Sequence, residues 1–140
     1  MTPDAPEEPR DGVIIVLQRG SRFLVGRRAE HKPAPGYWTQ VSGKVEAGET
    51  QQEAVAREAM EELGCRIEAR EKLQQGMSQG GHFRLHYWRS ELLEGEPRIN
   101  NAELTELRWV TPEELRQLAP VFEEDIQLFE QLLKGEWSRG

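Results

Sequence analysis

Three glutamates, Glu58, Glu61 and Glu62, stand close together near the end of a segment with helical periodicity. An α-helix turns by about 100° per residue, so these side chains span roughly 100° of its circumference and share one face. Like charges four residues apart, as at Glu58 and Glu62, repel each other and weaken a helix. We expect such a cluster where a cation lies in front of it. Ligands that are all oxygen favour Mg²⁺ or Mn²⁺ over zinc.

The same glutamates also allow a simpler interpretation, an exposed acidic helix that binds no metal. Glu53 with Arg57, and Arg57 with Glu61, are pairs of opposite charge four residues apart, which stabilise a solvated helix by themselves. A divalent cation separates the two interpretations, because it raises the melting temperature only if the folded protein binds it.

Residues 43–65 read GKVEAGETQQEAVAREAMEELGC. This segment resembles the signature of the Nudix hydrolases, G-x5-E-x7-R-E-U-x-E-E-x-G-U, in which U is a bulky apolar residue. Ala59 and Cys65 are small for the two U positions. The fixed positions all match, and they are Gly43, Glu49, Arg57, Glu58, Glu61, Glu62 and Gly64.

The resemblance implies hydrolysis of a phosphoanhydride bond in a nucleoside diphosphate linked to another moiety, with Mg²⁺ as cofactor and Mn²⁺ able to substitute. Such a reaction needs phosphate charge neutralised and a water activated, and carboxylate-held magnesium provides both. The resemblance makes Glu49 and Arg57 a pair that braces the loop against the helix. It makes Glu58, or a glutamate from elsewhere, the base that deprotonates water. The implied metal ligands are the carbonyl of Gly43 and the carboxylates of Glu58, Glu61 and Glu62.

Three candidate substrate-binding residues lie outside the fixed positions of the signature. Arg27 precedes a loop where basic residues of this family often meet a phosphate, and Lys44 lies in the signature loop. Either could equally be a solvated cation. Trp38 could stack on a base, although a tryptophan belongs more often to the core.

One further metal ligand or base is expected shortly before Trp109, where Glu103 and Glu106 are the candidates. We favour Glu106, and the alternative for both is a solvent-facing strand carboxylate. The histidines have no spacing that indicates zinc and are expected on the surface or on a sheet face. They are His31, His82 and His86.

Residues 36–43, GYWTQVSG, resemble the W-x-x-V-[ST]-G run of Nudix members that act on nucleoside or pterin triphosphates. This favours a (d)NTP, unmodified or oxidised, or dihydroneopterin triphosphate, cleaved to monophosphate and pyrophosphate. The alternatives are a nucleotide sugar, ADP-ribose, a dinucleoside polyphosphate or an mRNA 5′ end. Residues 75–82 lack the proline of ADP-ribose-cleaving members and the tyrosine of dinucleoside polyphosphate members, unless Phe83 replaces the latter. A non-catalytic nucleotide-sensing Nudix domain would usually have lost signature carboxylates.

Composition limits the class of protein and its partners. The net charge of −7 argues against long nucleic acid as a partner, and the single Cys65 excludes an internal disulfide. The longest aliphatic run, 13–17, is too short for a bilayer, and the N-terminus does not resemble a signal peptide. We therefore expect a cytoplasmic monomer or homodimer with a small-molecule nucleotide substrate and no membrane partner. Residues 1–10 are predicted to be a disordered lead-in, and 11–137 a single Nudix domain.

Strand and helix patterns alternate, which predicts an α/β fold with a mixed sheet between helices. The resemblance specifies the Nudix α/β/α sandwich. The apolar run 13–17 predicts a strand covered on both faces. A capping box at Thr50 and Glu53 begins the signature helix, and Gly64 ends it. Its apolar stripe, beside the carboxylates, is predicted as Val55, Ala56, Ala59, Met60 and Leu63. Further strands are predicted at 23–26, 37–42, 66–74, 82–92 and 104–110, loops at 29–36 and 76–81, and helices from a capping box at 111–114 and over 121–133.

Overall fold

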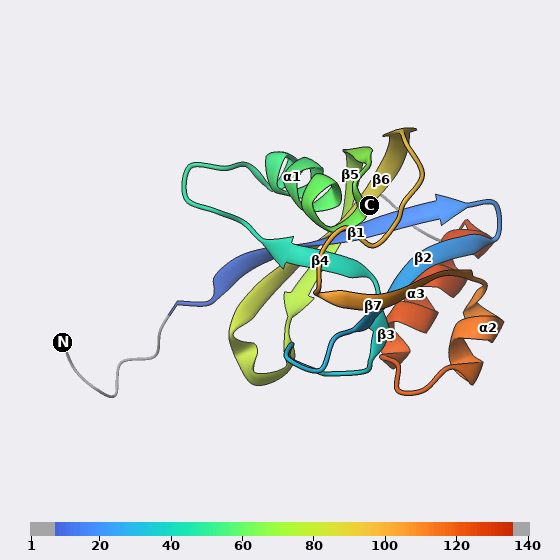
Figure 1. Ribbon diagram of the computed structural model, residues 1–140. Coiled ribbons are helices and arrows are strands. Elements are labelled where there is room, and N and C mark those ends of the chain that lie inside the picture. The colour runs from blue at the N-terminus through green and yellow to red at the C-terminus, as the bar shows by residue number, and fades with distance from the viewer. Residues whose placement is uncertain (1–7, 136–140) are drawn as a thin grey trace.

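A seven-stranded mixed sheet forms the centre of the protein in the computed structural model (Figure 1), which describes residues 8–135 except the side chain of Gln79. Residues 1–7 of the predicted lead-in, and 136–137 of the predicted domain, lie outside the described residues. The strands are β1 (Arg10–Arg19), β2 (Arg22–Arg28), β3 (Trp38–Thr39), β4 (Val41–Lys44), β5 (Arg66–Met77), β6 (Phe83–Glu94) and β7 (Leu104–Val110). The helices are α1 (Gln51–Leu63), α2 (Pro112–Gln117) and α3 (Glu123–Lys134), with a 3₁₀ turn, η1, at Gln79–Gly81.

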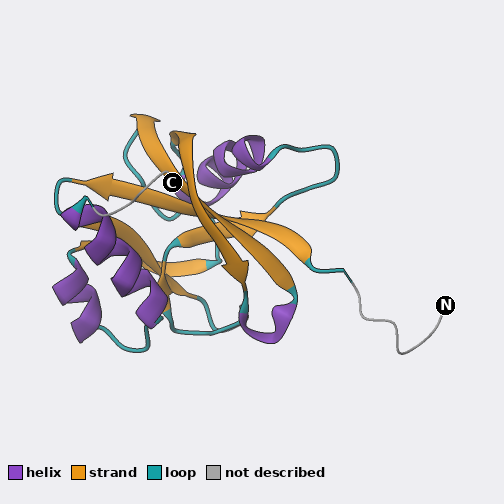
Figure 2. Ribbon diagram, turned by 180° about the vertical axis from the view of Figure 1, so that it is seen from behind, coloured by secondary structure: helices purple, strands orange, loops and turns teal. Residues whose placement is uncertain are grey.

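Strand β1 is the central strand of the sheet. It pairs in parallel with β6 and antiparallel with β4 and β2, while β5 adds to β6, and β3 and β7 flank β2. Alternate residues of the run 13–17 enter two cores: Val13, Ile15 and Leu17 pack with α1, whereas Ile14 and Val16 pack with α2 and α3. The helices therefore cover both faces of the sheet, which confirms the α/β/α sandwich (Figure 2).

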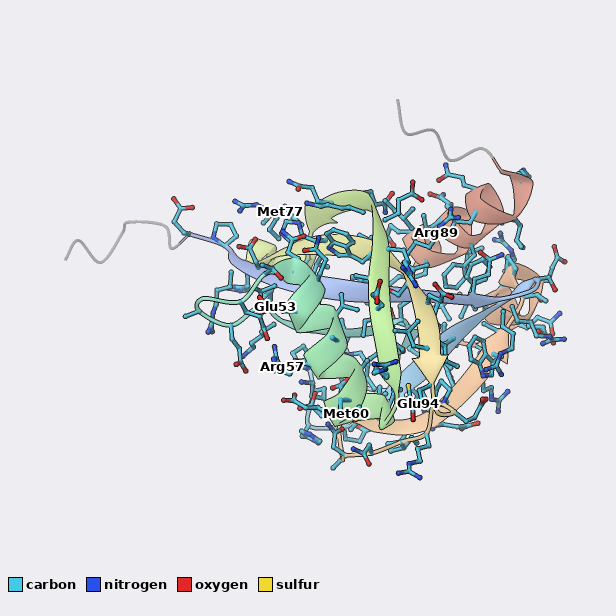
Figure 3. The ribbon with its side chains drawn as sticks, turned by 90° about the horizontal axis from the view of Figure 1, so that it is seen from above. Glu53, Arg57, Met60, Met77, Arg89 and Glu94 are labelled. Atoms are coloured by element: carbon cyan, nitrogen blue, oxygen red, sulfur yellow. The ribbon has the colours of Figure 1, made fainter. Side chains whose placement is uncertain are left out.

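Helix α1 begins and ends as its sequence predicts. Thr50 accepts a hydrogen bond from the Glu53 amide, the Glu53 carboxylate accepts one from the Thr50 amide, and Gly64 ends the helix in the left-handed region at φ 64°. The predicted apolar stripe is partly wrong, because Ala56 is exposed and Met60 points away from the core (Figure 3). The buried face of α1 is instead made up of Ala54, Val55, Glu58, Ala59, Glu62 and Leu63.

Several predicted boundaries shift. The predicted loop at 76–81 is wrong at its start, because β5 continues to Met77 and η1 follows it. Gln40 interrupts the strand predicted at 37–42, leaving β3 and β4. Strand β1 starts at Arg10, inside the predicted lead-in, and the last helix begins at Glu123 rather than at 121. Among the described residues, no helix combines the length and apolar character needed to cross a membrane.

Candidate active site

Strand β4 and helix α1 meet where Gly43 faces Glu58. The Glu58 carboxyl lies so close that a Cβ atom built on Gly43 would stand 2.0 Å from its Cδ atom. Glu58 is only 9 % exposed, and burial raises the pKa of its carboxyl, although Arg57 opposes the shift. Only glycine fits at position 43, because any side chain there would displace the Glu58 carboxylate.

Replacing Gly43 with alanine should displace the Glu58 carboxylate and lower kcat at least about 10-fold, since misplaced catalytic groups lose rate steeply. The fold should survive, because the overlapping atoms belong to the far end of a flexible side chain. Gly76→Ala is the matched control, as no heavy atom lies within 4 Å of a Cβ at that strand position. Steady-state rates of both variants test this, and equal rates would contradict the steric argument.

Glu62 is buried on the same helix and faces a carboxylate from another element. It is 4 % exposed, and its carboxyl hydrogen-bonds that of Glu103, which lies between β6 and β7. Burial, followed by the contact with Glu103 and the charge of Glu58, raises the pKa of Glu62 well above its usual range. The Lys32 ammonium, 2.8 Å from Glu103, lowers the pKa of that carboxyl instead. Glu62 and Glu103 therefore share a proton when no cation besides Lys32 is near them.

Arg57 holds the loop that precedes α1 against the helix (Figure 3). Its Nε and Nη2 atoms donate to both oxygens of Glu49 at 2.8 and 2.9 Å, and Nη2 also donates to the Lys44 carbonyl at 2.7 Å. Two parallel bonds between a guanidinium and a carboxylate give strength and fixed geometry. The loop and helix are thus joined in the way the resemblance implies.

The Nη1 atom of Arg57 also binds two of the expected metal ligands. It lies 2.9 Å from Glu58 Oε1 and 3.2 Å from Glu61 Oε2, and Glu61 is otherwise exposed. Within residues 8–135, no three His, Cys, Asp or Glu side chains converge as a ready-made ion cage. The site still suits a hard divalent cation. All of its candidate ligand atoms are oxygens, and the neighbouring cationic side chains only partly neutralise the buried carboxylates.

Glu106 does not reach this cluster. It lies on the α3 side of the sheet, where it pairs with Arg108 at 2.8 Å, whereas its neighbour Leu107 packs with the α1 core. A bulge in the pairing of β2 with β7 leaves Thr105 unmatched and reverses which face each residue occupies. The structure therefore brings Glu103 to the signature carboxylates in place of the favoured Glu106.

The three candidate substrate-binding residues are placed differently from one another. Trp38 is 6 % exposed within the α3-side core, and the guanidinium of Arg108 lies 5.0 Å from its ring centroid. Arg27, beside Trp38 in the sheet, and Lys44, at the end of β4, are both exposed. The two cations are accessible from solvent, and the Lys44 ammonium lies 6.0 Å from the centroid of the Phe83 ring, whereas Trp38 offers a base little surface.

Arg28, which follows Arg27 at the end of β2, lies close to the cluster, whereas His86 lies on β6. Arg28 is half-buried on the sheet near Glu62 and Glu103, and its desolvation lowers the pKa of the guanidinium. His86 is on a sheet face, as expected, but it is buried and its Nε2 atom lies 2.9 Å from Asp11. His31 and His82 are exposed.

A buried carboxylate lies on the opposite side of the sheet, at the start of α3. Asp125 is 4 % exposed and accepts hydrogen bonds from Thr39 Oγ1 at 2.8 Å and Gln40 Nε2 at 3.1 Å. Burial raises the pKa of Asp125 to about 6, against the effect of both bonds. Nothing in the sequence distinguishes this carboxylate, because Asp125 is one of several acidic residues in the first turn of a helix.

A family model described as NUDIX domain matches residues 8–132. The chain belongs to the Nudix family. This Nudix domain is 36 % identical over 109 residues to a Mycobacterium tuberculosis protein named putative 8-oxo-dGTP diphosphatase 2, and the match covers 76 % of each chain. It is 31 % identical to the CTP pyrophosphohydrolase of Escherichia coli, over 84 % of this chain and 87 % of that one.

The Nudix domain also resembles a solved structure. It is similar to the MutT NUDIX hydrolase of Burkholderia pseudomallei at a TM-score of 0.75 and 28 % identity, over 90 % of this chain and 99 % of that one. Sequence and fold therefore agree, and the protein is a Nudix hydrolase.

Proposed function

We propose that this Nudix hydrolase cleaves a nucleoside triphosphate to a monophosphate and pyrophosphate, with Mg²⁺ as cofactor and Mn²⁺ able to substitute. The observation that carries the proposal is the gathering of Glu58 and Glu62 with Glu103 at one end of α1, opposite Gly43. The substrate class is supported by two relatives, whose names give 8-oxo-dGTP and CTP as substrates.

Each residue of the site would have a distinct role in the reaction. Glu58, Glu61, Glu62 and the Gly43 carbonyl would hold the divalent cation, with Glu103 as a further oxygen ligand. When bound, the cation supplies charge neutralisation for the diphosphate and a lowered pKa for water. Arg57 orients Glu58 through the Nη1 bond while Glu49 fixes Arg57 itself.

Two further roles in the reaction are proton transfer and substrate binding. Burial raises the pKa of Glu58 and of Glu62, which makes either carboxylate a stronger base than an exposed glutamate. Lys44, at the end of β4, is an exposed cation available to the phosphates that are not cleaved, whereas Arg27 is the cross-strand partner of Glu106 on the α3 side of the sheet. Trp38 receives no role here, because it lies in the α3-side core with Arg108 against its ring.

The test is a screen of nucleoside triphosphates, nucleotide sugars, dinucleotides and capped RNA with Mg²⁺ in ¹⁸O-labelled water, with products identified by mass. We expect monophosphate and pyrophosphate from one or more triphosphates. Turnover of only a sugar-linked, dinucleotide or capped substrate would contradict the proposed substrate class, and release of orthophosphate would contradict the proposed cleavage point.

A further inference from the structure

The loop between β6 and β7 is fastened to the C-terminal end of α1. The amide of Arg98 donates to the Leu63 carbonyl at 3.0 Å, and the amide of Asn100 donates to the Glu62 carbonyl at 2.9 Å. Carbonyl groups at the end of a helix lack partners within the helix, so an external donor stabilises them. The loop therefore carries Glu103 to the same end of α1 that carries Glu61 and Glu62.

Within this loop, a single side-chain amide connects the backbones of two acidic residues. Asn101 donates from Nδ2 to the Glu61 carbonyl at 3.3 Å, and its Oδ1 atom accepts from the Glu103 amide at 2.9 Å. We propose that Asn101 is a positioning residue that fixes Glu103 against the metal-binding end of α1. This inference rests on the proposed metal site and adds to it a residue that never touches the cation.

Glu103 needs such a tether because its other contacts lead toward a different loop. Lys32 pairs with its carboxylate at 2.8 Å, and its carbonyl accepts from the Ala29 amide at 3.0 Å. Both partners belong to the segment after β2 rather than to α1. Among residues 8–135, the Asn101 bridge is the hydrogen-bonded link between Glu103 and α1, apart from the contact of its carboxyl with that of Glu62.

Asn100 provides a matched comparison, since it is the same residue type at the same helix end. Its Nδ2 atom donates to the Met60 carbonyl at 3.2 Å and the Glu61 carbonyl at 3.3 Å, and the bonds of its side chain do not include Glu103. Loss of either asparagine removes support from the end of α1. Only the loss of Asn101 should also release Glu103.

The experiment measures Mn²⁺ dissociation constants of the full chain by electron paramagnetic resonance, without nucleotide. Asn101→Ala should weaken Mn²⁺ binding about 10-fold, as is typical when a group that orients a ligand is removed. Asn100→Ala should change it less than about 3-fold. Because Asn101 acts through Glu103, Asn101→Ala should have no further effect in a Glu103→Gln background. Melting curves verify that each variant is folded at the temperature of the titration.

Equal weakening by the two alanine variants would overturn the proposal, and so would an undiminished effect of Asn101→Ala beside Glu103→Gln. Normal Mn²⁺ binding by the natural chain and by Asn101→Ala alike would overturn the role of Asn101 alone. A natural chain that binds no Mn²⁺ would overturn the proposed metal site and this inference together.

Discussion

The Glu62→Gln variant should turn over its nucleotide substrate at least about 100-fold more slowly than the natural chain, with its fold intact. Glutamine has the shape of the protonated acid that burial already favours at this position, so it should fit beside Glu103 without strain. Its side chain can donate a hydrogen bond to Glu103 as the protonated acid does. What it lacks is the negative charge that a divalent cation would attract.

The melting temperature distinguishes this explanation from simple damage to the fold. Without metal, Glu62→Gln should melt at or above the temperature of the natural chain, because a buried carboxylate with a raised pKa loses a charge that opposes folding. Glu94→Gln is the control, since that carboxylate is exposed at the end of β6. A Glu62→Gln variant that hydrolyses substrate at the natural rate would remove Glu62 from the site.

Asp125→Asn should stabilise the protein at pH 8, by up to about 3 kcal/mol. The folded pKa of about 6 exceeds the reference value of 3.8, so the folded state binds the proton more tightly than the unfolded state. The stability that this group contributes is therefore complete below pH 3.8 and is lost as the pH rises through 6. A difference of about 2 pKa units at about 1.4 kcal/mol each gives the magnitude. Asparagine keeps an acceptor for Gln40 or Thr39 and has no charge to bury.

Urea unfolding of both chains between pH 4 and 8 measures this effect. The difference in unfolding free energy should be small near pH 4 and should grow toward pH 8. Asp11→Asn is a control of opposite sign, because the hydrogen bond from His86 lowers the pKa of Asp11. Removal of that carboxylate should lower stability at neutral pH. A gap between Asp125→Asn and the natural chain that does not change with pH would contradict a buried, titrating Asp125.

The sequence predicts well those features that depend on close spacing. The capping box at Thr50, the helix end at Gly64 and the pairing of Arg57 with Glu49 each join residues within about two helical turns or one short loop. The two-sided burial of 13–17 follows from the absence of polar residues in that run. Local chemistry determines such features almost independently of the rest of the chain.

Features that depend on distant pairing were not predictable in the same way. The choice between Glu103 and Glu106 is decided by a bulge opposite Arg27 and Arg28, and a strand pattern read with period two cannot reveal a bulge. The burial of Glu58 and Glu62 in the inner face of α1 contradicts the expectation that such a face is apolar. Asp125 meets Gln40 across more than half the chain. In each of these cases a charged side chain lies at a position where hydrophobic packing alone would not have placed it.

The central claim is that the carboxylates at the end of α1 hold a divalent cation, and a calorimetric titration of Mn²⁺ tests it most directly. We expect the natural chain to bind at least one ion per molecule without nucleotide, and the Glu58→Gln, Glu62→Gln double variant, verified as folded by its melting curve, to bind at least about 100-fold more weakly. Equal binding by the two proteins, or nucleotide hydrolysis by a natural chain that binds no ion, would contradict the claim.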